Sequence, residues 1–341
     1  MLKKLSLAAL VTTMLTGTAF AKGPELFIQD FVGTVKVENS VSDNISITRD
    51  KNMKGVNIVE QGDSLKIDGG IERPDGNKCK GYYGSFDIGF FKKNKSGNFG
   101  GYEDLEDYPQ ITISAPKDTV LVIQNSIPFL NAEDLGGTDL DLRSCVKVEV
   151  GNVGGDLIAN IRGSADLTAN NVGDVDVNIK GSGDLEVQNA GFVTLSVTGS
   201  GDADFENVKS ADVSVSGSGD ISFGDIAGSL AAESRGSGDI DAGDVAGDFI
   251  YNARGSSDLD IGDVSGNRIS IDVTGSTDVS IDGGDIETLK VTASGSSDVD
   301  YDGKAEDADL VATGSSDIYV NKVTGEVRSK ERGSADISVS N

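Results

Sequence analysis

The tetrapeptide Gly-Ser-small-Asp returns ten times in the second half of the chain, and this repeat constrains the fold more than any other feature. Successive copies begin 18 to 20 residues apart. A fixed period of this length is typical of solenoid proteins, in which each repeat is one structural unit stacked on the next. The copies begin at Gly163, Gly181, Gly199, Gly217, Gly236, Gly255, Gly275, Gly295, Gly314 and Gly333.

Each repeat contains two short stretches in which apolar and polar residues alternate. In the second copy Leu185 and Val187 belong to the first stretch, and Val193, Leu195 and Val197 belong to the second. Alternation with a period of two indicates half-buried β-strands. Because 18 residues are too few for two strands and a packed helix, each repeat predicts one coil of a parallel β-helix. The repeated glycine suits a corner that needs a positive φ.

The aspartates of the repeat are expected to form a column, because neighbouring coils of a β-solenoid lie about 4.8 Å apart. Two carboxylates at this distance repel each other by roughly 1 kcal/mol in water. Two interpretations of what offsets this repulsion are open. In the first, each carboxylate caps backbone N–H groups at its own corner. In the second, Ca²⁺ is held between coils, with the candidate ligands Asp184, Asp202, Asp220, Asp239 and Asp258.

A second column of short amide and carboxylate side chains is expected between the two strands of each coil. It adds weak support for a bound cation, because Ca²⁺ prefers oxygen ligands. Its members are Asn171, Asn189, Asn207, Asp225, Asp244 and Asp263.

The first 21 residues have the three parts of a secretory signal peptide. Lys3 and Lys4 form the charged start, Leu5–Leu15 the apolar centre, and Ala19-Phe20-Ala21 the small-x-small cleavage site. No other apolar run is long enough to span a membrane. The sequence therefore predicts an exported protein of the periplasm, the cell surface or the extracellular space. Its net charge of −27 disfavours nucleic acids and anionic membrane surfaces as partners.

Residues 22–341 are expected to form a single β-solenoid domain. Residues 22–124 correspond to irregular N-terminal coils, because end coils have to cap the stack, and 125–341 to the regular repeat. The alternating stretches from Leu26 to about Ile71 are interpreted as the opening strands of the same solenoid. Asn125-Ser126 and Arg143-Ser144 occupy the positions of two degenerate corners.

Residues 72–109 interrupt the rhythm with an insertion rich in aromatic residues, including Tyr108. A long irregular segment of this kind is either a cap over an open end of the solenoid or a ligand-binding surface. The partner in the second case would be an envelope or extracellular glycan or protein. The candidate ligand-binding residues are Tyr82, Tyr83, Phe86, Phe90, Phe91, Phe99 and Tyr102.

The chain has two cysteines, Cys79 in the insertion and Cys145 beside the second degenerate corner. An even number of cysteines in an exported protein favours a disulfide, which would tie the insertion to the coils. Free thiols are the alternative.

The chain contains no histidine. This excludes Ser-His-Asp and Cys-His nucleophiles and histidine-ligated zinc. Pairs of carboxylates could act on a polysaccharide, but such chemistry needs a groove built by loops from several coils, and these coils are short and uniform. We therefore expect no catalytic residues and no enzyme activity.

The pattern Gly-Ser-Gly-Asp followed by apolar-x-apolar resembles the head GIN domain family of auto-transporter adhesins. The stretches that carry the resemblance begin at Gly181, Gly199, Gly217 and Gly236, and the likeness extends over roughly Leu26–Asn341. The resemblance implies a right-handed parallel β-helix and a cell-envelope or extracellular setting. It implies no particular catalytic or binding residues.

These observations favour an exported, non-catalytic binding or structural module of the bacterial cell envelope, similar to an adhesin. The second hypothesis is a Ca²⁺-dependent solenoid whose aspartates bind the ion and couple it to folding outside the cell. The third is an enzyme that processes an envelope polysaccharide.

Overall fold

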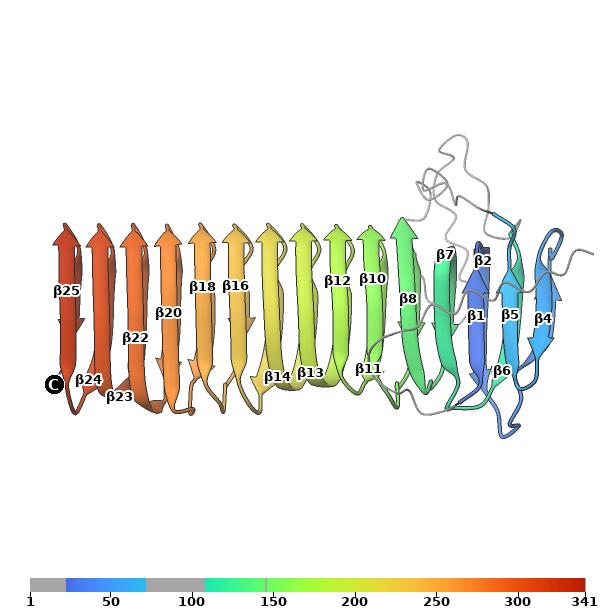
Figure 1. The fold of residues 1–341 in the computed structure, drawn as a ribbon, viewed down its shortest axis with the longest axis horizontal. Coiled ribbons are helices and arrows are strands. Elements are labelled where there is room, and N and C mark those ends of the chain that lie inside the picture. Colours follow the sequence, from blue (N-terminus) through green and yellow to red (C-terminus); the bar gives the residue numbers. More distant parts are fainter. Residues whose placement is uncertain (1–22, 72–107, 145, 341) are drawn as a thin grey trace, which may run out of the picture.

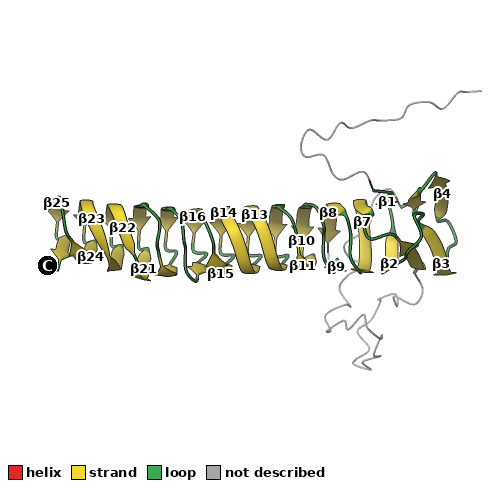
Figure 2. Ribbon diagram, turned by 90° about the horizontal axis from the view of Figure 1, so that it is seen from below, coloured by secondary structure: helices red, strands yellow, loops and turns green. Residues whose placement is uncertain are grey.

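The computed structural model describes residues 23–71, 108–144 and 146–340. These residues form an all-β solenoid of about 12 turns and contain no helix. Figure 1 shows the coils stacked along one straight axis, from the blue N-terminal strands to the red C-terminal ones. Seen from below in Figure 2, the coils form successive rows of strands joined by short loops. The predicted all-β solenoid is confirmed.

Each regular coil contributes one strand that runs into the corner and one strand that leaves it. The strands that run into the corner are β8 (Gly137–Ser144), β10 (Leu157–Gly163), β12 (Val175–Gly181), β16 (Leu230–Gly236), β18 (Phe249–Gly255), β20 (Arg268–Gly275), β22 (Asp285–Gly295) and β25 (Val327–Gly333). The strands that leave it are β9 (Lys147–Val150), β11 (Asp166–Asn171), β15 (Ile221–Ile226), β17 (Ile240–Ala242), β19 (Leu259–Asp263), β21 (Asp278–Gly283), β24 (Asp317–Val323) and β26 (Asp336–Val339). Three long strands take both roles, β13 (Leu185–Gly199), β14 (Ala203–Gly217) and β23 (Asp298–Gly314).

Neighbouring coils pair in parallel and in register, so that equivalent residues lie directly above one another. Gly181 pairs with Gly199, and Gly199 pairs with Gly217. The inward residues of each strand are buried and form one continuous core along the axis. Phe205 and Phe223, for example, stack across two coils with their ring centroids 5.1 Å apart. Because no coil has a core of its own, stacking is what buries the apolar side chains.

The corner glycines have the positive φ that the repeat predicts, between 93° and 148°. A side chain is excluded there, because a Cβ built on Gly217 would lie 2.1 Å from the carbonyl oxygen of Gly199. Both degenerate corners are confirmed as corners. Ser144 pairs with Gly163 and has a φ of 70°, and Asn125 has a φ of 46°. Values this small belong to the left-handed region that Asn tolerates better than most residues.

The N-terminal strands do not follow their sequence order in space. They are β1 (Glu25–Gln29), β2 (Val32–Asn39), β5 (Ser64–Asp68), β6 (Gln110–Ala115) and β7 (Val120–Ala132). β1 lies between β5 and β7, and β2 lies between β6 and β7. The coil formed by β5 and β6 therefore lies outside the coil that precedes it in the chain.

Two further strands close this end and differ from the expected parallel coils. β3 (Ser46–Lys51) pairs antiparallel with β6, and β4 (Asn57–Gln61) pairs antiparallel with β5. Most of their side chains are exposed. The outermost strands thus form hairpin-like pairs, which cover the edge of the outer coil.

The C-terminal coil ends the stack with polar residues at positions that are apolar elsewhere. β25 lies on β23, where Ser329 pairs with Leu310 and Glu331 pairs with Ala312. Leu310 and Ala312 are buried inward residues. Glu331 accepts a hydrogen bond from the backbone N–H of Ile337 at 3.2 Å. An inward-pointing charge on an edge strand is one way in which natural sheets prevent edge-to-edge association.

Candidate functional site

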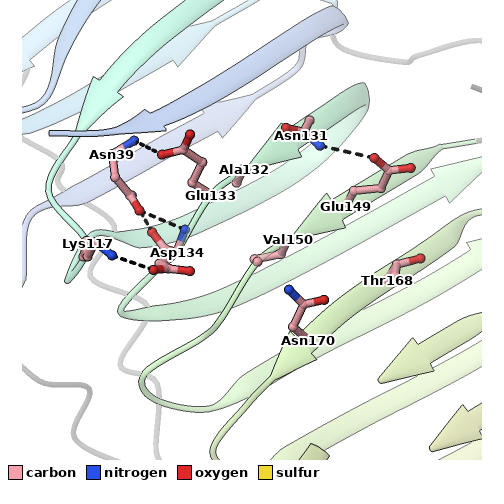
Figure 3. A pocket seen from close by; sticks show the side chains of 11 residues that line it. Asn39, Lys117, Asn131, Ala132, Glu133, Asp134, Glu149, Val150, Thr168 and Asn170 are labelled. Carbon is pink, nitrogen blue, oxygen red and sulfur yellow. Dashed lines mark hydrogen bonds and ion pairs between the residues drawn. The ribbon is translucent and has the colours of Figure 1, made fainter. Parts of the chain in front are cut away.

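A polar groove with a volume of about 580 Å³ opens where the irregular N-terminal coils meet the regular array. It lies at the ends of β2, β7, β9 and β11, away from the glycine corner (Figure 3). We call it the junction groove. The residues that define it are Asn39, Lys117, Asn131, Asp134, Glu149, Thr168 and Asn170.

Asn39 holds the loop that forms one wall of the junction groove. Its side-chain amide donates to the carbonyl oxygen of Asp134 at 2.8 Å and accepts from the N–H of Asp134 at 3.1 Å. Its own N–H donates to the Glu133 carboxylate at 2.7 Å. These bonds connect residues more than 90 positions apart in the sequence. They order the groove before any ligand arrives.

Asp134 is held in its ionised form. Lys117 donates to its carboxylate at 2.8 Å, and Asn152 donates from its backbone N–H at 3.1 Å and its side-chain amide at 2.9 Å. These hydrogen bonds, with that of Lys117 the largest contribution, lower the pKa of Asp134 to about 2. The bond to Asp134 in turn raises the pKa of Lys117. The pair stays charged over the whole physiological range.

Glu149 is bound on both sides. Lys147 lies 2.7 Å from one carboxylate oxygen, and the Asn131 amide donates to the other at 3.2 Å. Asn131, Glu149 and Thr168 occupy equivalent positions on β7, β9 and β11, so their side chains form one row along the groove. Figure 3 shows this row together with Asn170.

A ladder of asparagine amides begins at the junction groove and runs along the solenoid. Each amide donates to the side-chain oxygen of the preceding coil: Asn171 to Asn152 at 2.6 Å, Asn189 to Asn171 at 2.7 Å and Asn207 to Asn189 at 3.0 Å. The ladder ends on the carboxylate of Asp134 through Asn152. The second polar column of the sequence is therefore a chain of hydrogen bonds, in which all amides point the same way.

The acidic members of that column bond differently. The Asp225 and Asp244 carboxylates accept from the backbone N–H of Asp244 and Asp263, at 3.1 and 3.0 Å.

The corner aspartates form the predicted column, and their carboxylates accept backbone N–H groups. The N–H belongs to the aspartate of the next coil, however, and not to the same corner. The N–H of Asp202 donates to Asp184 at 3.1 Å, and the N–H groups of Asp220, Asp239 and Asp258 donate to the aspartate before them at 2.8 to 2.9 Å. Each bond offsets part of the repulsion between stacked carboxylates.

The same column raises the pKa of some of its members. For Asp278, burial is the first cause and the charges of Asp258 and Asp298 are the next. Among the described residues, no three acidic or other metal-binding side chains are grouped so that they could hold an ion. The Ca²⁺ hypothesis stays a prediction.

A family model described as "Putative auto-transporter adhesin, head GIN domain" matches residues 32–241 and 230–341. The chain belongs to this family. The matches contain the corner column, the asparagine ladder and the junction groove, and membership indicates an exported protein. Searches of curated proteins and of solved structures gave no match.

In this head GIN domain a second, smaller groove of about 370 Å³ lies farther along the same corner of the coils. Asp285, Glu287, Lys304 and Glu306 line it, and Lys304 lies 3.9 Å from Asp285. This groove has fewer internal bonds than the junction groove. In the described part of the head GIN domain, no helix has the length and apolar character needed to cross a membrane.

Several predictions from the sequence lie outside the described residues. They concern the signal peptide, the disulfide between Cys79 and Cys145, and the aromatic candidates Tyr82, Tyr83, Phe86, Phe90, Phe91, Phe99 and Tyr102. Tyr108, from the end of the same insertion, is described. It is partly buried and packs against the core, which is the behaviour expected of a cap.

Sequence reasoning did not identify the junction groove. Asn39 and Asp134 carry no motif, and they meet only because β2 pairs with β7. Thr168 and Asn170 belong to an ordinary repeat. The one available signal was the irregular spacing just before the first regular coil.

Proposed function

We propose that this head GIN domain is a non-catalytic binding module of the bacterial cell envelope, and that it binds its ligand in the junction groove. The observation that carries the proposal is the groove itself: a hollow of about 580 Å³ whose polar groups are positioned by hydrogen bonds within the protein. Ligand sites usually have volumes of about 300–1,000 Å³ and a few fixed polar groups. Membership in an adhesin family supports the same function.

The chemistry of the groove supports binding and not hydrolysis. A glycoside hydrolase needs one carboxyl with a raised pKa as the proton donor. Asp134 has its pKa lowered to about 2 and stays ionised. Glu149 is fixed by Lys147 and Asn131.

The proposal is tested with the fluorescently labelled protein on glycan arrays and on whole bacterial cells. We expect the double variant Thr168→Ala/Asn170→Ala to lose binding by about tenfold or more, since two hydrogen-bonding groups are removed. Neither side chain bonds to another described residue, so the fold should be retained. The matched control is Asn178→Ala/Thr194→Ala, which removes the same residue types from β12 and β13.

Loss of binding in both double variants, or in neither, would contradict the assignment to the junction groove. Far-UV circular dichroism and thermal unfolding establish that all variants are folded. Release of shorter oligosaccharides from a bound polysaccharide would contradict the non-catalytic role.

A further inference from the structure

The charged groups of the junction groove neutralise one another within the protein. Lys117 pairs with Asp134 at 2.8 Å, and Lys147 pairs with Glu149 at 2.7 Å. The side chains of Asp134 and Glu149 are only 30% and 27% exposed, so their ion pairs are partly shielded from water. The third carboxylate, that of Glu133, accepts the N–H of Asn39. A charged ligand would have to compete with these existing partners.

The groups left without a protein partner are neutral. In the described part of the chain, the Thr168 hydroxyl and the Asn170 amide make no side-chain hydrogen bond, and the Asn131 amide uses only its N–H₂ group, toward Glu149. Both Thr168 and Asn170 are half-buried. A hydroxyl and a primary amide each both donate and accept hydrogen bonds. Such groups match the hydroxyl groups of a sugar ring, which also do both.

The protein around the groove disfavours anionic ligands. The net charge of the chain is −27, and Glu149 and Thr168 are followed in the same row by Glu186 and Asp204. A neutral sugar avoids both this repulsion and the competition with Lys117 and Lys147 for the groove carboxylates.

We propose that the ligand of the junction groove is a neutral, hydroxyl-rich glycan, bound through Thr168, Asn170 and the free carbonyl of Asn131. This inference rests on the proposed function and specifies its ligand class. The hydrogen bonds are neutral, so affinity should change little with salt, whereas an ionic ligand would bind more weakly as salt increases.

The test compares four hexasaccharide probes by isothermal titration calorimetry with the full chain: cellohexaose and an N-acetylglucosamine hexamer as neutral ligands, a glucosamine hexamer as the cationic ligand and a galacturonate hexamer as the anionic one. We expect at least one neutral probe to bind at least tenfold more tightly than either charged probe. Its Kd should change less than twofold between 50 and 500 mM NaCl, on the order of what weak screening allows. Thr168→Ala/Asn170→Ala should weaken it about tenfold, and Asn178→Ala/Thr194→Ala should not.

The outcomes separate the two proposals. Preferred binding of a charged probe that is lost in Thr168→Ala/Asn170→Ala would overturn the ligand class and leave the groove as a binding site. Binding of any probe that is unaffected by this variant would overturn both. Failure of all four probes, when cells still bind the protein through the groove, would overturn the glycan assignment and favour a protein ligand.

Discussion

Ile161 packs against Gly183 of the next coil so closely that a Cβ built on this glycine would lie 2.7 Å from the Cγ2 atom of Ile161. The same relationship joins Ile179 to Gly201, at 3.0 Å. Where the third residue of the repeat is Thr277, the position equivalent to Ile161 is Ala253. The sizes of these two positions therefore compensate each other along the core, as close packing requires.

Replacing Gly183 with alanine should destabilise the solenoid. The added methyl group meets Ile161 and, at 2.4 Å, the carbonyl oxygen of Ala165, and such overpacking typically costs about 1–3 kcal/mol. Urea unfolding of Gly183→Ala, Ile161→Ala and the double variant measures the free energies. We expect the double variant to be less destabilised than the sum of the single ones. Simple additivity would show that Ile161 is not the residue that excludes the side chain.

The polar C-terminal coil should keep the molecule monomeric at that end. In the double variant Ser329→Val/Glu331→Leu the inward positions of β25 become apolar, and the unpaired strand becomes a template for another chain. We expect concentration-dependent association in light scattering after size exclusion. Ser196→Val, an outward substitution on β13, is the control. A strictly monomeric Ser329→Val/Glu331→Leu variant would contradict a capping role for Glu331.

The direction of the asparagine ladder predicts a difference between amide and carboxylate at Asn189. Asn189→Asp removes the donor to Asn171 and places a carboxylate beside the Asn171 oxygen, which is also an acceptor. We expect a loss of about 0.5–1.5 kcal/mol, the usual contribution of one hydrogen bond. Asn178→Asp makes the same change in charge on β12, where no bond is lost. Equal melting temperatures of the two variants would contradict a stabilising ladder.

Stability should pass through a maximum at mildly acidic pH. Burial and neighbouring carboxylates raise the pKa of Asp241, Asp278 and Asp300 above 3.8, so these groups bind protons more readily in the folded state. Their contribution is favourable when pH falls toward 3.8 and is lost as pH rises through their folded pKa values. Asp134, with its pKa lowered to about 2, stabilises the fold above 3.8, and this contribution is lost as pH falls toward 2.

Asp241→Asn tests this explanation. It should raise the melting temperature at pH 7, where Asp241 is charged beside Asp260 and Asp239, and change it little near pH 4. An equal decrease at both pH values would show that the carboxylate is needed for another reason.

Calcium should affect the thermal unfolding of the protein no more than magnesium does. One carboxylate oxygen of each of Asp184, Asp202 and Asp220 is already bound to a backbone N–H of the next coil. We expect equal, small increases in melting temperature with the two ions, because both screen the net charge of −27. Differential scanning calorimetry with each ion and with a chelator measures this. A large increase with Ca²⁺ alone would establish the aspartate column as a calcium site.

The strands and corners of the regular coils could be predicted from the sequence because they depend on local patterns. Alternation identifies the inward residues, and the repeated glycine identifies the corner. The degenerate corners at Asn125 and Ser144 were also found from spacing. Hydrogen bonding between coils was harder to foresee, because an aspartate such as Asp184 has its own corner and the next coil equally close in reach.

The sequence by itself determined the coil, its register and the position of the core, since a constant period leaves only one way to place each glycine above the last. The tertiary structure alone decided the order of the N-terminal strands and the existence of the junction groove. Both depend on β2 lying beside β7, and thus on contacts such as Asn39 with Asp134 that join distant parts of the chain. No local pattern records such a contact, because its free energy comes from packing and hydrogen bonds that exist only after the coils have stacked.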